Sequence, residues 1–199
     1  MARKSVLAAV IGLSLAVTMV SSTLAVGLWL KPGTFDPERS GIVKAVWVPN
    51  QGVSDDGGTH AGLLLSKNGP SSTNASAGAS IFGSNGLALN EFGWDVRDDG
   101  YCGDNSPRFY VVTMDNVSHD VGCSSSSLSA SHRFTDDQGV DWKRLRYDPR
   151  DASPPIYRGQ QVKIIGIIFD AGTDQGEGFV YLDNIEINDT SVANSPRGR

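Results

Sequence analysis

Hydrophobic and polar residues alternate along much of the chain with the period of two that is typical of β-strands. In the segment RFYVVTM, residues 108–114, Phe109 and Val111 alternate with Tyr110 and Val112. β-branched and aromatic residues dominate this segment, as a pleated, half-buried strand favours. The pattern therefore predicts a strand whose two faces carry these two sets of side chains.

Segments of this kind recur between short stretches rich in Gly, Asp and Asn, which favour turns. The predicted strands are Gly41–Val48, Ala61–Ser66, Ile81–Gly83, Leu87–Leu89, Glu91–Arg97, Arg108–Met114, Val117–Gly122, Val140–Tyr147, Gln161–Asp170 and Phe179–Asn188. After the N-terminal apolar run, no segment shows a helical period. We therefore predict an all-β fold, an antiparallel two-sheet sandwich that is jelly-roll-like, with a closed barrel as the alternative.

The N-terminal segment has the features of an export signal. Arg3 and Lys4 precede an uncharged apolar run over residues 6–20. This order predicts a signal peptide over residues 1–25, cleaved after Ala25. The alternative is an uncleaved membrane anchor over residues 5–30, which is long enough to span a bilayer. Both interpretations place the rest of the chain outside the cytoplasm, secreted or at the cell surface.

The remainder of the chain, roughly 170 residues, is long enough for one domain with a core of its own. We expect a linker over residues 26–40, a β-sandwich domain over 41–188 and a disordered tail over 189–199. Asn74, Asn116 and Asn188 stand in glycosylation sequons, which would matter only in a eukaryotic host.

The two cysteines, Cys102 and Cys123, flank the predicted hairpin formed by residues 108–122. Asp115 and Asn116 supply its turn, so the strand after them brings Cys123 back toward the start of the hairpin. A Cys102–Cys123 disulfide would close the open end, and export to an oxidising compartment favours it. The alternative is two free, buried thiols.

Charge argues against two classes of partner. The chain has 199 residues and a formal net charge of -5, and loss of Arg3 and Lys4 would make it more acidic. No basic stripe remains, so nucleic acid is excluded as a partner, and a membrane is expected only if the N-terminal segment is uncleaved.

The C-terminal third carries a resemblance to known domains. GFVYLDNIEIN, residues 178–188, is similar to the closing strand of jelly-roll carbohydrate-binding and galactose-binding-like domains, and KIIGIIFDAGTDQGEG before it fits the same ending. The chain also resembles uncharacterised secreted bacterial β-sandwich domains, through LLLSKNGPSSTNASAGA and CGDNSPRF. These resemblances imply the fold and export, while sugar binding follows from the first only by analogy.

Sugar binding on a sandwich requires an aromatic platform beside polar groups that bond hydroxyls. The candidate ligand-binding residues are Trp94, Tyr101, Asp98, Asp99 and Trp142, which combine aromatic rings with polar loops. The alternative interpretation is that Trp94 and Trp142 belong to the core, because large aromatic side chains are highly buried on average.

We expect no cofactor, and a structural calcium ion is the alternative. The candidate ligands are Asp170, Asp174, Glu177 and Asp183, because hard cations prefer several carboxylate oxygens. The alternative is that Asp183, which interrupts an apolar strand, is bonded by an arginine or by backbone amides. The three histidines are scattered and the chain lacks a Gly-x-Ser-x-Gly motif, so we expect neither zinc nor a serine hydrolase.

These observations leave three hypotheses. The first is a secreted, non-catalytic binding module for a glycan or cell-wall polymer, which predicts exposed aromatic side chains flanking a sheet face. The second is an extracellular structural or interaction protein without a small-molecule site. The third is a polysaccharide hydrolase, which predicts two carboxylates facing each other across a cleft.

Overall fold

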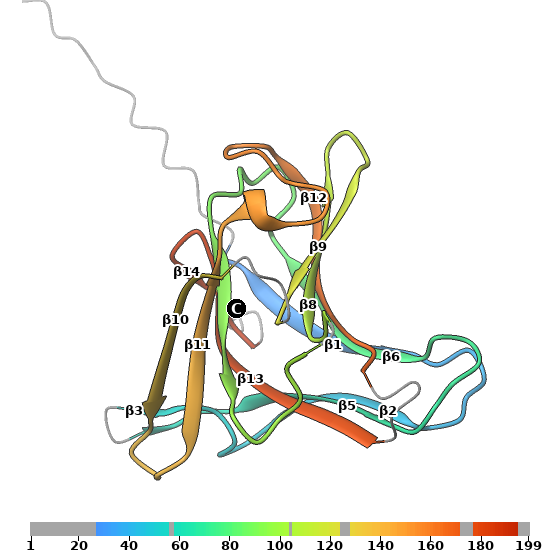
Figure 1. The fold of residues 1–199 in the computed structure, drawn as a ribbon, viewed down its shortest axis with the longest axis vertical. Coiled ribbons are helices and arrows are strands. Elements are labelled where there is room, and N and C mark those ends of the chain that lie inside the picture. Colours follow the sequence, from blue (N-terminus) through green and yellow to red (C-terminus); the bar gives the residue numbers. More distant parts are fainter. Residues whose placement is uncertain (1–26, 56–57, 104, 124–127, 172–176, 195–199) are drawn as a thin grey trace, which may run out of the picture.

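The computed structural model describes residues 27–55, 58–103, 105–123, 128–171 and 177–194, which form a sandwich of two antiparallel sheets (Figure 1). The five-stranded sheet has the order β1 (Trp29–Phe35), β6 (Ser76–Phe82), β12 (Val162–Phe169), β8 (Arg108–Thr113) and β9 (Ser118–Gly122). The seven-stranded sheet has the order β10 (Leu128–Thr135), β11 (Asp141–Tyr147), β7 (Phe92–Arg97), β13 (Glu177–Ile187), β5 (Gly62–Asn68) and β2 (Val43–Val48), with β14 (Thr190–Ser191) paired to β13. The predicted fold class, an all-β antiparallel two-sheet sandwich, is confirmed.

The minor elements are the hairpin β3 (Ser54–Asp55) and β4 (Gly58–Thr59), and a 3-10 helix, η1 (Pro149–Asp151). Among the described residues, no helix is long and apolar enough to cross a membrane.

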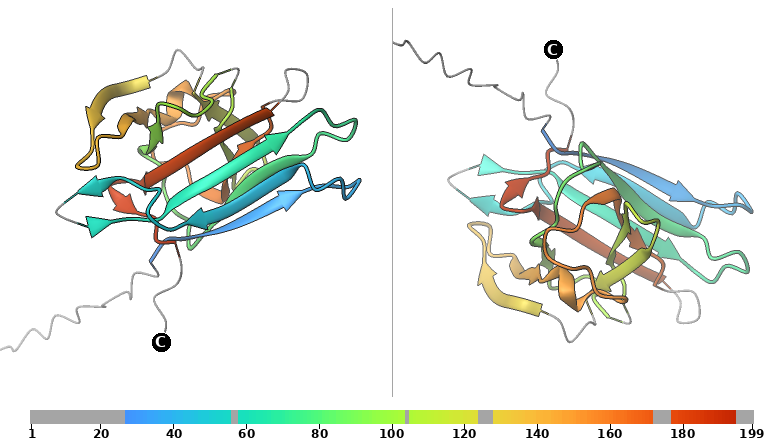
Figure 2. Two further views of the ribbon diagram at one scale, coloured as in Figure 1. Left: turned by 90° about the horizontal axis from the view of Figure 1, so that it is seen from below. Right: turned by 90° about the horizontal axis from the view of Figure 1, so that it is seen from above.

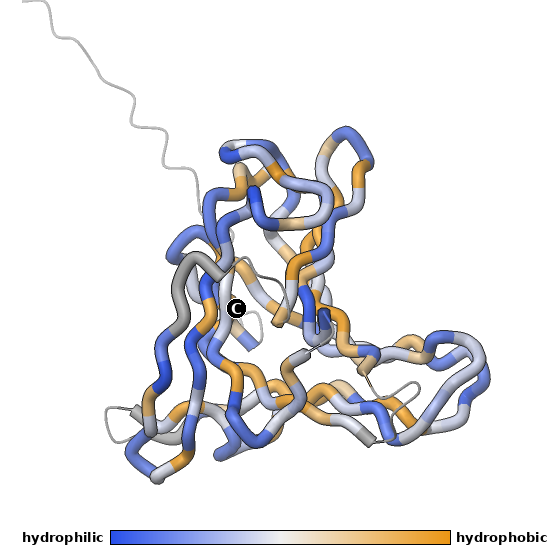
Figure 3. The backbone as a smooth tube through the Cα atoms, in the orientation of Figure 1, coloured by the Kyte–Doolittle hydropathy of each residue, from blue (hydrophilic) through white to orange (hydrophobic). Residues whose placement is uncertain are grey.

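The core lies between the inward faces of the two sheets. Along the strands, hydrophobic and hydrophilic residues change repeatedly (Figure 3), and the hydrophobic residues that face inward form the buried core. Trp94 of β7 stacks on Phe109 of β8 with ring centroids 4.2 Å apart, so this aromatic contact joins the two sheets. Phe92 and Tyr147 pack edge-on against this pair and stack on each other. In β8, Phe109 and Val111 are buried, which confirms the predicted alternation.

Three predictions of irregular structure are wrong in part. The predicted linker over residues 26–40 contains β1, which pairs with β6 along its whole length. No strand is predicted between Gly122 and Val140, yet β10, an edge strand of the seven-stranded sheet, lies there. The predicted disordered tail over residues 189–199 is wrong for residues 190–193, because β14 forms there, Val192 is buried and the Leu30 amide donates to the Ala193 carbonyl over 2.8 Å. Figure 2 shows β1 and the C-terminal segment meeting at this end. Residues 195–199 lie outside the described residues.

The segment over residues 67–80 resembles a linker in composition, yet its second half is β6, an interior strand of the five-stranded sheet. Ala77, Ala79 and Ile81 face the core, while Gly78 and Ser80 face outward. The low β-propensity of Ala, Gly and Ser concealed this strand, because neighbouring strands on both sides supply the stabilisation that composition does not indicate.

The predicted disulfide is confirmed. Cys102 and Cys123 are bonded, and their Cα atoms lie 5.1 Å apart. The bond joins the segment before β8 to the end of β9 and so closes the open end of the β8–β9 hairpin. The predicted signal peptide and the alternative anchor lie almost entirely outside the described residues.

We expect the double substitution Cys102→Ser with Cys123→Ser to lower the free energy of unfolding by about 3 kcal/mol, because the bond closes a loop of 21 residues. Urea denaturation of the two proteins measures this difference. A reducing agent should produce the same loss in the wild type and none in the double variant. Equal stability of the oxidised wild type and the variant would contradict the prediction.

Candidate functional site

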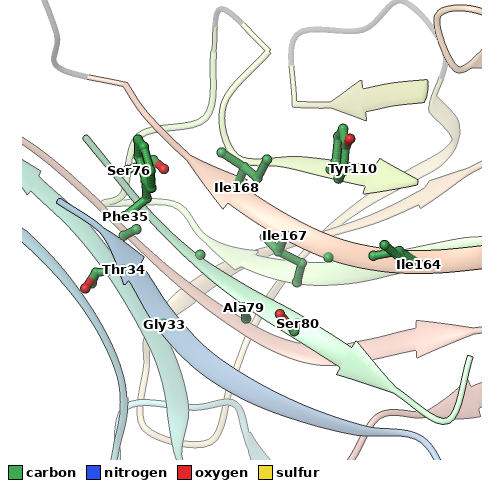
Figure 4. A pocket seen from close by; sticks show the side chains of 13 residues that line it. Gly33, Thr34, Phe35, Ser76, Ala79, Ser80, Tyr110, Ile164, Ile167 and Ile168 are labelled. Carbon is green, nitrogen blue, oxygen red and sulfur yellow. The ribbon is translucent and has the colours of Figure 1, made fainter. Parts of the chain in front are cut away.

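A trough of about 570 Å³ lies on the outward face of the five-stranded sheet (Figure 4). It is lined by Gly33, Thr34, Phe35, Ser76, Ala77, Gly78, Ala79, Ser80, Tyr110, Ile164, Gly166, Ile167 and Ile168. These residues come from β1, β6, β8 and β12, so the trough crosses the strands. Strand register assembles it, since Gly33 lies opposite Gly78 and Ser80 lies opposite Gly166.

The floor of the trough lacks large side chains, partly because β6 and β12 approach closely there. A Cβ atom on Gly78 would lie 2.5 Å from the Ile167 carbonyl oxygen, and one on Gly166 would lie 3.1 Å from the Ala79 carbonyl oxygen. Gly33 differs, because a Cβ atom there would meet nothing within 4 Å. Glycine is thus sterically required at 78, whereas at 33 it only leaves the trough open.

The walls are apolar and exposed. Phe35 is 58% exposed and Ile164 is 48% exposed, at opposite ends of the trough in Figure 4. On the same face, Phe82 is 42% exposed and stacks on Trp29 with ring centroids 4.2 Å apart. A group of exposed apolar side chains on one face of a sheet is typical of an interaction site.

Polar groups in the trough are mostly hydroxyls. Ser76, Ser80 and Thr34 carry hydroxyls along β6 and β1, and the Tyr110 hydroxyl lies 3.1 Å from Ser118 Oγ. None of the described residues lining the trough carries a formal charge. The trough is therefore a neutral, apolar channel with hydroxyl groups along it.

Arg108 and two carboxylates adjoin the trough and bond to one another. Arg108, two residues before Tyr110 on β8, donates to Asp120 over 3.0 Å and to Asp170 over 2.8 Å. Partial burial favours its neutral form, but the bonds and charges of Asp170 and Asp120 prevail and raise the pKa of Arg108. The two carboxylates thus share one guanidinium, an arrangement that holds β8, β9 and the end of β12 together.

The predicted aromatic platform does not form. Trp94 is fully buried in the core, and Trp142 is 1% exposed with its Nε1 donating to Asp136 over 3.1 Å. Tyr101 is half-buried and packs edge-on against Phe169. Both tryptophans are therefore buried, as the alternative interpretation expects: Trp94 belongs to the core cluster, and Trp142 is buried beside Asp136.

The acidic candidates beside that platform are paired with arginines. Asp99 accepts from Arg97 over 2.7 Å, and Asp98 accepts from Arg133. Asp98 and Trp142 do come together around a small hollow of about 240 Å³, but the indole ring is not accessible there. The structure thus offers no exposed ring beside these aspartates among the residues it describes.

Among the described residues, no three or more His, Cys, Asp or Glu side chains form a group that could hold a metal ion. The two predicted calcium ligands whose side chains are described, Asp170 and Asp183, have other partners. Asp170 is bonded to Arg108. Asp183 accepts from the Val53 and Asn184 amides, both over 2.8 Å, so backbone amides are its partners, while burial raises its pKa. Asp174 and the side chain of Glu177 lie outside the described residues.

Sequence reasoning missed Phe35, Phe82 and Ile164 as exposed residues of one face. Only Tyr110 had a usable signal, because its alternation with Phe109 placed it on the opposite face of the strand. The others share one sheet face through the pairing of β1, β6 and β12, which are distant in sequence.

Comparisons with known proteins bear on the fold alone. No family model and no curated protein matches the chain. The chain is similar in structure to a family 11 carbohydrate-binding module of the cellulosomal cellulase Lic26A-Cel5E of Clostridium thermocellum. The sequence identity is 12%, the match covers 79% of this chain and 86% of that chain, and the TM-score is 0.44. The chain is also similar to a family 11 carbohydrate-binding module from Clostridium thermocellum in complex with a β-1,3-1,4-mixed-linked tetrasaccharide. The sequence identity is 12%, the match covers 88% of this chain and 94% of that chain, and the TM-score is 0.45. At this identity and these TM-scores the likeness says nothing about a ligand of this chain.

We expect Gly78→Ala to lower the free energy of unfolding by about 1–3 kcal/mol, because the added methyl group would overlap the β12 backbone. The matched variant Gly33→Ala has free space and should change it by no more than about 0.5 kcal/mol. Urea denaturation of both variants checks the pair. Equal losses of stability in the two variants would contradict the conclusion that glycine is sterically required only at position 78.

Proposed function

We propose that the chain is a non-catalytic extracellular binding module whose trough holds a segment of a neutral glycan or cell-wall polymer. The observation that carries the proposal is the trough itself, with its small-residue floor between exposed Phe35 and Ile164 and the half-buried Tyr110. Ligand sites of this type combine apolar walls with a few oriented polar groups.

The chemistry of the trough suits sugar rings. A pyranose presents C–H groups on its faces, which pack on aromatic and aliphatic side chains, and hydroxyls on its edges. Tyr110 offers both a ring and a hydroxyl, and Ser76, Ser80 and Thr34 add hydroxyls that donate or accept. The absence of charged residues among the described lining residues favours a neutral polymer, because an ionised ligand would lose hydration without gaining a partner.

The dimensions suit a polymer better than a single sugar. The trough involves four of the five strands, and adjacent strands lie about 4.8 Å apart, so it extends for roughly 14 Å across the sheet. A chain of sugar rings can follow such a channel. The disulfide supports an extracellular location, because disulfides persist in oxidising compartments.

The hydrolase hypothesis receives less support from the geometry. No carboxylate is found among the described residues that line the trough, and the nearest pair, Asp120 and Asp170, is bonded to Arg108. A hydrolase requires one carboxyl group free to donate a proton and a second free to attack or to activate water. The hypothesis of an extracellular interaction protein also accounts for the exposed apolar face. The binding experiments below distinguish it from our proposal.

The first test fills the trough. Gly33→Trp places an indole over the floor, where a side chain meets no obstacle, and should weaken retention on the polysaccharide that binds the wild type best by about tenfold, or 1.4 kcal/mol. Affinity electrophoresis in gels containing mixed-linkage β-glucan, xylan, glucomannan or mannan measures the retention.

Gly27→Trp is the matched control, because Gly27 also has free space around its Cα and lies outside the trough. It should bind as the wild type does. If no polysaccharide, soluble or insoluble, retains the wild type, or if Gly33→Trp binds as tightly as Gly27→Trp, the proposal is wrong.

The second test separates the ring of Tyr110 from its hydroxyl. Tyr110→Ala removes the stacking surface and should weaken binding by about 1 kcal/mol, or roughly fivefold. Tyr110→Phe keeps the ring and loses only the contact with Ser118, so it should retain most of the affinity. Isothermal titration with an oligosaccharide of the retained polymer measures both; equal losses in the two variants would show that stacking on Tyr110 does not contribute.

A further inference from the structure

We infer that the chain has a second carbohydrate-binding site, separate from the trough, in a hollow beside the β8–β9 turn. The hollow measures about 570 Å³ and lies between this turn and residues 154–160; its walls include Asp115, Val117, Pro155, Tyr157, Arg158 and Gln160. It shares no lining residue with the trough. The choice of a sugar as ligand rests on the proposed function, whereas the hollow itself does not.

The segment that forms one wall is held firmly in place. Ser153 and Asp120 exchange backbone hydrogen bonds of 2.9 and 3.1 Å, which attach this segment to the edge strand β9. Buried His119 donates from Nδ1 to the Pro154 carbonyl over 2.7 Å, and its Nε2 lies 3.0 Å from Thr113 Oγ1. At the far end, the Leu89 amide donates to the Gln160 carbonyl over 3.1 Å. A ligand therefore meets a wall that is already ordered, which lowers the entropic cost of binding.

Tyr157 is the most exposed large hydrophobic side chain in the described part of the molecule, at 74%. Its exposure is not caused by a loose backbone, because its amide donates to Gln160 Oε1 over 3.2 Å and its carbonyl accepts from the Gln160 amide over 2.9 Å. The fold thus presents a phenol ring to solvent on a tight turn. A tyrosine ring is a platform on which a sugar face can pack, and its few rotatable bonds limit the entropy lost.

Planar polar groups lie around this ring. The Thr113 hydroxyl donates to the Asp115 carboxylate and is the main reason that the pKa of Asp115 lies below its ordinary value, so this carboxylate stays ionised as an acceptor. Gln160 supplies an amide and Arg158 a guanidinium to the same hollow. Acceptors and donors beside one exposed ring match the hydroxyl-bearing edge and the C–H face of a pyranose.

The experiment uses the full chain with the trough blocked by Gly33→Trp, so that binding at the second site is observed alone. Saturation-transfer NMR is recorded with the methyl glycosides of glucose, galactose, mannose and N-acetylglucosamine as probes. We expect transfer to at least one glycoside. The transfer should fall to the baseline when Tyr157→Ala is added, and it should persist when Phe179→Ala is added instead.

Phe179→Ala is the matched control, because Phe179 is also an exposed aromatic residue but belongs to β13 of the other sheet. Absence of transfer to all four glycosides in the Gly33→Trp protein, or transfer that Tyr157→Ala does not reduce, would overturn the second site. Neither outcome depends on whether the trough retains polysaccharide. That retention is measured separately, by comparing Gly33→Trp with Gly27→Trp. The failure of one site is therefore distinguishable from the failure of the other.

Discussion

The contact between Trp94 and Phe109 joins the two sheets at the centre of the core, and the arrangement of the outer surface depends on it. Phe109 faces inward to meet Trp94, so the next residue along β8, Tyr110, must face outward. A shift of one residue in the pairing of β8 would exchange these two rings and place a hydroxyl in the apolar core. The packing of the core and the position of Tyr110 in the trough are therefore set by the same register.

The outward faces of the two sheets have different chemistry, which is why the trough is the candidate site. On the seven-stranded sheet, the fully buried Asp95 accepts from Arg144 over 2.9 and 2.8 Å and from Asn184 over 2.9 Å. Arg146 donates to Glu186 over 2.7 Å beside them. These groups satisfy one another. On the five-stranded sheet, small residues leave a neutral channel with exposed walls, and its polar groups are hydroxyls that can still bond a ligand.

Features that depend on residues close together in the sequence were predictable, and features that depend on distant residues were not. The alternation in residues 108–114 and the position of the cysteines around a hairpin are local, so the β8 strand and the Cys102–Cys123 bond were both predictable. The ligand residues were not, because aromatic character alone does not indicate exposure. Trp94 and Trp142 are buried, whereas Trp29, with a ring of the same size, is only partly buried. The exposed Phe35 follows a Lys-Pro-Gly-Thr segment that resembles a linker.

The sequence by itself determined that the chain is all-β, that two sheets pack through alternate residues, and that one disulfide closes a hairpin, because these properties arise from side-chain period and near neighbours. Only the tertiary structure decided that Gly33, Gly78 and Gly166 form one floor and that Phe35 and Tyr110 belong to one channel. Their strands are distant in sequence, and their adjacency results from antiparallel pairing between β1, β6, β12 and β8, which no local pattern specifies.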